Sequence, residues 1–347
     1  MNSRRHSPRA RRHRAALSLG LGIALVLSVA AAPANQNVLP YKPEAGPYRV
    51  EFVRYDWHDA RRDRNVPVKL YFPASGDGPF PVIVFSHGLG GTREDYAYLG
   101  RHWASHGYVA VHLQHLGSDD AVWRGSPDPM ESLRRAVRDP AAAIHRPLDV
   151  SFAIDQLERL QAEDSPLRGR LDLEQIGVAG HSFGAFTTLA VAGMVLALPG
   201  EERTMRDPRV KAAIPMSAPV PERREHLGRM YGAIAIPCLH ITGTLDYSPI
   251  TPQTRPEDHQ LPFEHSRGPD KYLLVFEGGD HMVFSGVRRR QAARADVELD
   301  PVFHSLIRQA TTAFWDAYLR NDTAARQWLA DGGLEAVLGV HGVLKKK

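Results

Sequence analysis

Short, continuously apolar runs alternate with longer mixed segments along most of the chain. The run FPVIVFS at 80–86 has the uninterrupted apolar character of a strand that is buried on both faces of a sheet. Strands are expected at 48–57, 66–74, 80–88, 108–115, 176–179, 210–219, 236–244 and 271–278, and helices at 93–107, 139–161, 185–198 and 302–322. This alternation predicts an α/β fold: a mostly parallel sheet of about eight strands with helices on both faces.

Two local expectations accompany this pattern. Pro147 lies early in the segment 139–161 and is expected to mark the true start of that helix. Only about 18 residues, 219–236, separate the sixth and seventh expected strands, so no large lid domain is expected there. In parallel sheets, functional residues gather at the carboxyl ends of the strands.

The first 34 residues read as a targeting segment. A basic stretch at 1–14 precedes an apolar run of 18 residues at 15–32, and small residues follow, with cleavage most plausible after Ala34. We expect a signal peptide at 1–34 and an exported protein, periplasmic or extracellular. An uncleaved membrane anchor is the alternative, since the run is near the lower limit for a span. Residues 35–347 are expected to form a single domain with a short, solvated C-terminal tail.

Charge and cysteine content narrow the function classes. The net charge of +4 becomes −2 without residues 1–34, which carry six arginines and no acidic residue. The basic character therefore belongs to the targeting segment and does not argue for a nucleic-acid partner. Cys238 is the single cysteine, so the chain has no internal disulfide, and its apolar surroundings predict a buried, inert strand residue.

The segment Gly180-His181-Ser182-Phe183-Gly184 is the strongest chemical signal. It follows an expected strand and precedes an expected helix, which is the setting of a nucleophile elbow, G-x-S-x-G. Gly180 and Gly184 remove the collision that side chains would cause between strand and helix. Ser182 is therefore the candidate nucleophile, with an ordinary Gly-Ser turn as the alternative.

A serine nucleophile needs a base and an acid. His281 follows the last expected strand of the sheet in GGDHMVFSG, and Asp246 follows the strand before it in HITGTLDYSPI. These positions suit a base that takes the serine proton and an acid that orients it. Asp280 and Glu277 are less suitable acids, because the first adjoins His281 and the second lies within a strand.

The loop SHGLGGTRED supplies the remaining expected part of the site. Backbone N–H groups of Leu89 and Phe183 are predicted to form an oxyanion hole, and Gly88 and Gly90 let the loop approach the substrate closely. His87 is expected to brace this loop by hydrogen bonding, without a role in proton transfer.

Other chemistries fit the sequence poorly. His112 and His115, in HLQH, lack the H-E-x-x-H pattern of a helical zinc site. The sequence contains neither a P-loop nor a G-x-G-x-x-G after a first strand, which argues against nucleotide binding. No metal and no cofactor is expected.

With these residues in place, the chain resembles the α/β-hydrolase superfamily, and within it the platelet-activating-factor acetylhydrolase and predicted dienelactone hydrolase group. The motifs are FSHGLGG, GHSFG, RPLDVSFAIDQL and GGDHMVFSG, and the resemblance spans roughly 80–320. It implies an α/β-hydrolase fold, with Ser182 as nucleophile, His281 as base, and Leu89 and Phe183 as oxyanion donors.

Two departures limit what the resemblance implies. The acetylhydrolases carry their acid after the sixth strand, where this chain has PMSAPV, and dienelactone hydrolases use cysteine at the elbow. The GHSMGG motif and disulfide of exported polyester hydrolases and cutinases are also absent.

The sequence therefore predicts an exported serine carboxyl-ester hydrolase acting on small or short-chain esters through an acyl-enzyme. The alternatives are a phospholipid-type acetylhydrolase or lipase, and a peptidase or acyltransferase on the same triad. A non-enzymatic binding protein fits least well. The expected partner is a small-molecule or lipid ester, with a membrane only if residues 1–34 stay uncleaved.

Overall fold

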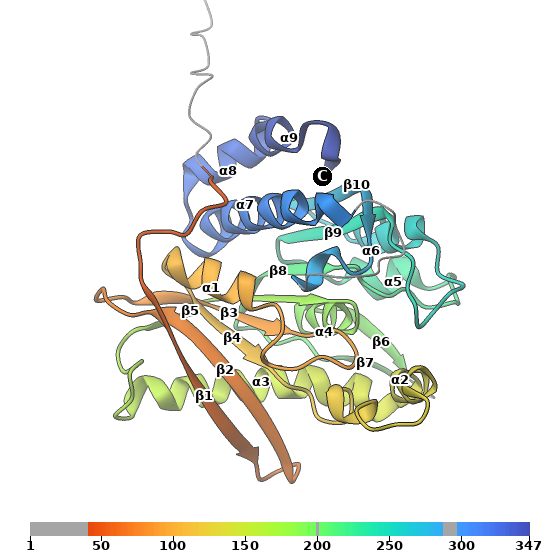
Figure 1. The fold of residues 1–347 in the computed structure, drawn as a ribbon, viewed down its shortest axis with the longest axis horizontal. Helices are drawn as coiled ribbons and strands as arrows, with labels where there is room; N and C mark the ends of the chain where they lie inside the picture. Colours follow the sequence, from red (N-terminus) through yellow and green to blue (C-terminus); the bar gives the residue numbers. More distant parts are fainter. Residues whose placement is uncertain (1–40, 199–200, 287–296) are drawn as a thin grey trace, which may run out of the picture. The chain divides into compact units, whose positions relative to one another are not determined.

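A nine-stranded mixed sheet organises the protein in the computed structural model, which describes residues 41–198, 201–286 and 297–347 (Figure 1). The expected signal peptide at 1–34 lies outside the described residues. The strand order is β1-β2-β4-β3-β5-β8-β9-β10-β11. The sheet strands are β1 Val50–Asp59, β2 Arg64–Pro73, β3 Phe80–Ser86, β4 Val109–Leu113, β5 Leu171–His181, β8 Val210–Met216, β9 Cys238–Leu245, β10 Lys271–Asp280 and β11 Gly342–Lys346.

The six strands from β4 to β10 in this order are mutually parallel. β2 pairs antiparallel with β4, β1 pairs antiparallel with β2, and β11 pairs antiparallel with β10. The mostly parallel α/β-hydrolase architecture is thus confirmed. It places the carboxyl ends of β3, β5, β9 and β10 along one edge, where the candidate residues follow.

Helices cover both faces of the sheet, as predicted (Figure 1). The helices are α1 Ala97–Ser105, α2 Pro129–Arg138, α3 Pro140–Ala162, α4 Phe183–Ala192, α5 Leu227–Gly232, α6 Leu261–His265, α7 Asp300–Leu319, α8 Thr323–Ala330 and α9 Gly333–Leu338. On one face, α1 and α7 bury Trp103 against Trp315, with ring centroids 6.1 Å apart. On the other face, α3 and α4 bury Ile154 and Leu189. Among the described residues, no helix combines the length and apolar character needed to cross a membrane.

The expectation for Pro147 is wrong, because it lies inside α3 rather than at its start. The helix begins at Pro140, where the Asp139 side chain caps it by accepting a hydrogen bond from the Ala141 N–H. An internal proline removes one helical hydrogen bond. Here Pro147 is itself buried, and α3 continues to Ala162 because its apolar face packs into the core.

The helix predicted over 185–198 ends early. α4 stops at Ala192, and Gly193 takes the left-handed conformation that terminates a helix. Residues 195–198 instead form β6 (Val195–Leu198), which pairs with β7 (Glu201–Thr204) in a small separate sheet. The segment 115–140, for which no element was predicted, contains α2, which the Asp128 side chain caps.

The short C-terminal tail is also a wrong expectation. Residues 323–338 form α8 and α9, and 342–346 add β11 to the edge of the sheet, which makes nine strands instead of eight. The three terminal lysines are exposed residues. Their backbone nevertheless pairs with β10, and the N–H and C=O of Lys347 bond those of Lys271.

Candidate active site

Ser182 occupies a sharp turn between β5 and α4. Its backbone has φ 54° and ψ −117°, a conformation that non-glycine residues rarely adopt. Backbone hydrogen bonds hold the turn on both sides, from the Ser182 N–H to the Met216 carbonyl at 2.9 Å and from the Ala185 N–H to the Ser182 carbonyl at 2.8 Å. Such local strain persists only where the surroundings fix it, and it is characteristic of functional sites.

Gly180 and Gly184 have the steric role that the sequence predicts. A Cβ atom on Gly184 would collide with the backbone carbonyls of Ser86 and His87, and one on Gly180 would collide with the backbone of Gly184. The elbow and the end of β3 therefore touch through backbone atoms alone. This contact sets the distance between the turn that carries Ser182 and the loop that follows β3.

The structure brings Ser182, His281 and Asp246 into one hydrogen-bonded chain. The His281 Nε2 lies 3.0 Å from the Ser182 hydroxyl oxygen, and the His281 Nδ1 lies 2.7 Å from the Asp246 Oδ1. Each residue follows a different parallel strand: β5, β9 or β10. The two other acids that were considered point elsewhere, since Asp280 accepts from the Met282 N–H and Glu277 contacts the Thr244 hydroxyl.

Asp246 is completely buried and remains ionised. Burial alone would raise the pKa of this carboxyl, but electrostatic interaction with the neighbouring His259 and His281 rings and hydrogen bonds from His281 and Ser217 hold it below its usual value. The Ser217 and Thr242 hydroxyls both donate to the Oδ2, and the Thr242 distance is 2.6 Å. A carboxylate can only accept, so the Nδ1 of His281 carries a proton and its Nε2 lone pair faces Ser182.

The two expected oxyanion donors lie close to Ser182, one at the cavity that contains it and one directly after it in the elbow. Leu89 lies in the loop after β3 and borders the cavity that contains Ser182. Phe183 is the first residue of α4, where N–H groups have no partner inside the helix. The loop depends on its glycines: Gly90 has φ 77° and donates its N–H to the Ser118 carbonyl at 2.8 Å, and Gly88 lies against His181.

His87 braces this loop, as expected. Its Nδ1 donates to the Gly88 carbonyl at 2.6 Å, and its Nε2 accepts from the His115 N–H at 3.0 Å. Burial holds the pKa of His87 well below its usual value, so the ring stays neutral. Neither ring nitrogen contacts Ser182, which is consistent with a structural role.

A cavity of about 300 Å³ opens above Ser182. Its walls come from the loop after β3, from α2, from the segment after β9 and from the turn after β10. The apolar lining residues are Leu89, Met130, Leu133, Pro249, Ile250 and Met282. Asp95 and Tyr96 add polar groups at one side, and the Tyr96 hydroxyl lies 2.8 Å from the His181 Nδ1.

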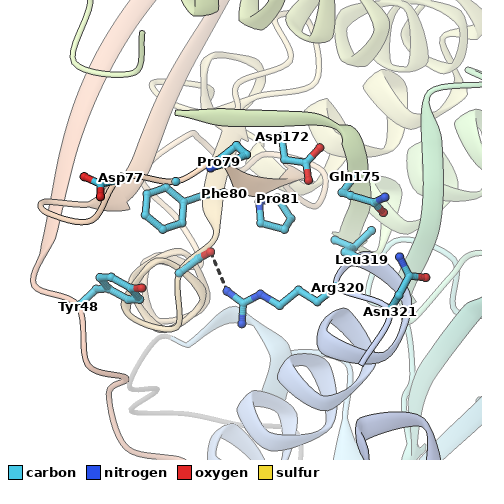
Figure 2. A pocket seen from close by; sticks show the side chains of 12 residues that line it. Tyr48, Asp77, Pro79, Phe80, Pro81, Asp172, Gln175, Leu319, Arg320 and Asn321 are labelled. Atoms are coloured by element: carbon cyan, nitrogen blue, oxygen red, sulfur yellow. Dashed lines mark hydrogen bonds between the residues drawn. The ribbon is translucent and has the colours of Figure 1, made fainter. Parts of the chain in front are cut away.

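A larger cavity of about 610 Å³ lies at the opposite edge of the sheet, where β3 begins (Figure 2). Figure 2 shows Arg320 extending into it near Tyr48 and Phe80. The Arg320 guanidinium is already bound, donating to the His106 and Gly107 carbonyls at 2.7 and 2.8 Å. This cavity contains none of the predicted site residues.

Several residues near the site were not predicted. Arg146 is fully buried and donates to the His87 carbonyl and, at 2.8 Å, to the Ser118 hydroxyl, while its guanidinium lies 4.6 Å from the centre of the Phe183 ring. The only sequence signal for it was its place in RPLDV. His259 approaches Asp246 from a 3₁₀ turn at Pro256–Gln260, and no motif marks it.

Potential metal ligands coincide with the triad. Within the described ranges, Asp246, His259 and His281 are the one group of acidic or histidine side chains whose ligand atoms all lie within 4.8 Å of each other. The Asp246–His281 hydrogen bond already occupies two of these atoms. His112 and His115 do not form such a group; His115 instead bridges Ser86 and Asp149, at 3.1 and 3.0 Å.

Comparison with known proteins agrees with this geometry. Residues 58–124 match the family described as platelet-activating factor acetylhydrolase, isoform II, and residues 153–283 match the family described as serine hydrolase (FSH1). Cutinase 2 of Thermobifida cellulosilytica is 24% identical over 271 residues, which cover 78% of this chain and 80% of that protein. The platelet-activating factor acetylhydrolase of Cavia porcellus is 27% identical over 149 residues, 36% of this chain and 34% of that protein. Cutinase est1 of Thermobifida alba is 26% identical over 213 residues, 61% and 56% of the two chains.

Proposed function

The chain belongs to the α/β-hydrolase superfamily of serine hydrolases, and from that premise we propose that it hydrolyses small or short-chain carboxylic esters through an acyl-enzyme on Ser182. The observation that carries the proposal is the hydrogen-bonded chain Ser182–His281–Asp246 on a strained elbow. The matched relatives, cutinases and an acetylhydrolase, agree in acting on esters.

In the proposed mechanism, the ester carbonyl binds between the Ser182 hydroxyl and the N–H groups of Leu89 and Phe183. His281 takes the hydroxyl proton at Nε2 as the Ser182 oxygen attacks the carbonyl carbon. The two N–H groups stabilise the oxyanion. His281 then gives the proton to the departing alkoxide, which leaves an acyl-Ser182 ester. In the second half, His281 deprotonates a water molecule that attacks this ester, and the acid is released.

The cavity supports the small-substrate part of the proposal. A space of about 300 Å³ is at the lower end for small-molecule sites, and its apolar walls suit a short acyl or alkoxy group. Between β8 and β9 the chain forms only the six-residue helix α5, so this segment supplies no large cover. We therefore propose hydrolysis without activation at a lipid surface.

The test is hydrolysis of p-nitrophenyl esters from acetate to palmitate by the purified protein and by Ser182→Ala. We expect turnover to be highest for the short chains, and kcat to fall by about 10⁴-fold or more in the variant. A fluorophosphonate probe should label the wild-type protein alone. A maximum at long chains, or a rise in rate above the micellar concentration of a lipid ester, would instead indicate a lipase or phospholipid hydrolase.

Export is a separate proposal that rests on residues 1–34. Their basic start, apolar run and small residues support cleavage after Ala34. Expression of the full chain in a secreting bacterial host, followed by fractionation and N-terminal sequencing, tests it. The expected product is a soluble exported protein that starts at Asn35; a full-length product in the membrane fraction would support an uncleaved anchor.

A further inference from the structure

A second histidine faces the carboxylate of the proposed triad. The His259 Nε2 lies 3.6 Å from the Asp246 Oδ1, the same oxygen that accepts from the His281 Nδ1 at 2.7 Å. The His259 side chain is 1% exposed, and its ring centroid lies 6.1 Å from that of His281. The two histidines approach one carboxylate from different elements, the 3₁₀ turn at 256–260 and the end of β10.

The other ring nitrogen fixes how His259 can be protonated. Its Nδ1 lies 2.8 Å from the Ala218 carbonyl, which can only accept, so the Nδ1 carries a proton. In a neutral ring, the Nε2 would then present its lone pair to the carboxylate. That nitrogen is buried and has no hydrogen-bond partner among the described residues. A proton on the Nε2 removes the repulsion and makes His259 an imidazolium paired with Asp246.

Among the described residues that face these two histidines, Asp246 is the shared counter-charge. The Oδ2 of Asp246 is occupied by the Ser217 and Thr242 hydroxyls, which leaves the Oδ1 to the histidines. In the part of the chain that the structure describes, the titratable groups that face His259 from neighbouring elements are Asp246 after β9, His281 after β10, and His181 at the end of β5.

On the 3₁₀ turn itself, the neighbouring Asp258 carboxylate turns away, to Arg224 at 3.0 Å. Burial holds the pKa of His181 well below its usual value, so that ring stays neutral. Asp246 is thus the anion that can balance a proton on His259.

We infer that His259 is a positioning residue of the triad whose protonated Nε2 shares the Asp246 carboxylate with His281, so that protonation of the two histidines is mutually opposed. This inference rests on the proposed esterase function. With His259 charged, a second proton on His281 meets a nearby cation and a partly neutralised carboxylate. The enzyme is therefore expected to stay active to lower pH than it would without a cation at His259.

The test compares the pH dependence of kcat/KM for p-nitrophenyl acetate in wild-type protein, His259→Gln and His259→Phe. Both variants remove the cation. His259→Phe also keeps a side chain of ring size, so it can be used if His259→Gln fails to fold. The midpoint of the acid limb is expected to move upward by about one pH unit or more, as the Coulomb interaction over roughly 6 Å implies. Each sample is returned to pH 8 to show that lost activity recovers, which separates titration from unfolding.

His102→Gln is the matched control. His102 is also buried and also bonds a neutral partner, but it lies in α1 and contacts the Thr312 hydroxyl of α7 at 3.1 Å. Burial lowers the pKa of His102 to about 3, so the ring is neutral across the assay range. Its replacement should leave the acid midpoint where it is.

A second measurement does not depend on activity. In wild-type protein labelled with ¹⁵N-histidine, the His259 ring, assigned from whichever variant folds, is expected to carry protons on both nitrogens near neutral pH. An active enzyme with an unmoved or lowered midpoint in the variants, or a singly protonated His259 ring, overturns the inference. Absence of turnover and of Ser182 labelling in wild-type protein overturns the proposed function instead, while the ring protonation still decides the inference.

Discussion

At the scale of single residues, the site depends on a backbone contact that leaves no room for a methyl group. The elbow touches the end of β3 at Gly184, whose Cβ position is filled by the Ser86 and His87 carbonyls. The oxyanion loop continues directly from His87. Any side chain at 184 therefore moves the nucleophile away from the loop that should hold the oxyanion.

Gly184→Ala is expected to lower kcat/KM for p-nitrophenyl acetate by at least about 100-fold, because a displacement of the reacting groups near 1 Å has that effect. Overpacking should also lower the free energy of unfolding by about 1–3 kcal/mol. Activity assays and urea unfolding measure both. Gly228→Ala is the control, since a Cβ atom there meets its nearest neighbour, the His265 Nδ1, at 3.8 Å. Equal activity of the two variants would contradict the argument.

The sequence could predict the residues whose position along the chain is itself informative. Ser182, Asp246 and His281 each follow a recognisable apolar strand, and the parallel sheet brings strand ends together. His259 could not be predicted in this way, because it comes from a 3₁₀ turn in a Pro-rich segment and reaches Asp246 only through tertiary packing. The Ser217 and Thr242 hydroxyls could not be predicted either, because only tertiary packing shows which side chains face the Asp246 carboxylate.

At the scale of elements, α3 connects the two structures that should form the oxyanion hole. From this helix, Arg146 donates to the His87 carbonyl on the loop after β3 and, at 2.9 Å, to the Thr187 hydroxyl on α4. The guanidinium also lies against the Phe183 ring. Burial lowers the pKa of Arg146 to about 9, so the group remains a cation at neutral pH.

Arg146→Met should therefore weaken the oxyanion hole without touching substrate. We expect kcat to fall by about 100-fold with a smaller change in KM, since the loss concerns the transition state. Each buried acceptor left unpaired should also lower the free energy of unfolding by about 1–3 kcal/mol. Arg124→Met serves as the control, because Arg124 forms an exposed pair with Asp120 that contributes little. An unchanged kcat in a folded Arg146→Met protein would exclude this role.

Elements were predictable where local pattern and final environment agree. The strand at 80–86 is apolar up to Phe85 and is buried throughout. Two boundaries failed for different reasons. Pro147 is tolerated because tertiary packing of α3 overrides its local preference. Residues 195–198 leave the helix because Gly193 ends it locally, in the left-handed conformation. β11 was missed because its pairing with β10 joins residues far apart in sequence, and a run ending in three lysines resembles a solvated tail.

At the scale of the whole molecule, the fold encloses many neutral histidines. Burial is the largest cause that lowers the pKa in each case, to about 4 for His112 and His115 and to about 3 for His102 and His240. In the unfolded chain these groups titrate near 6.5. Below that pH the unfolded chain binds protons that the folded protein does not.

The buried neutral histidines should therefore make their full contribution to the free energy of unfolding above about pH 6.5. This contribution should be lost as the pH falls from there toward about 4. Below this window, protonation of Asp149, whose pKa is held at about 2 by His115 and Arg64 against the effect of burial, adds to the loss. Urea unfolding at half-unit pH steps measures the effect. Replacement of His102 by Gln should flatten the curve slightly, since one proton-binding difference disappears. A free energy of unfolding that stays constant between pH 7 and 5 would contradict the expectation.

The buried chain Ser86–His115–Asp149 repeats the residue types and the contact order of the proposed triad, with distances of 3.1 and 3.0 Å. All three side chains are sealed from solvent, and Arg62 and Arg64 pair with the carboxylate at 2.7 and 2.9 Å. One molecule thus carries the same arrangement twice, once open to a cavity and once enclosed. A search for active sites by atomic distances alone would find two in this protein, whereas an acylating reagent should find one. Access from solvent, and not the hydrogen-bond geometry, therefore distinguishes the reactive serine from the structural one.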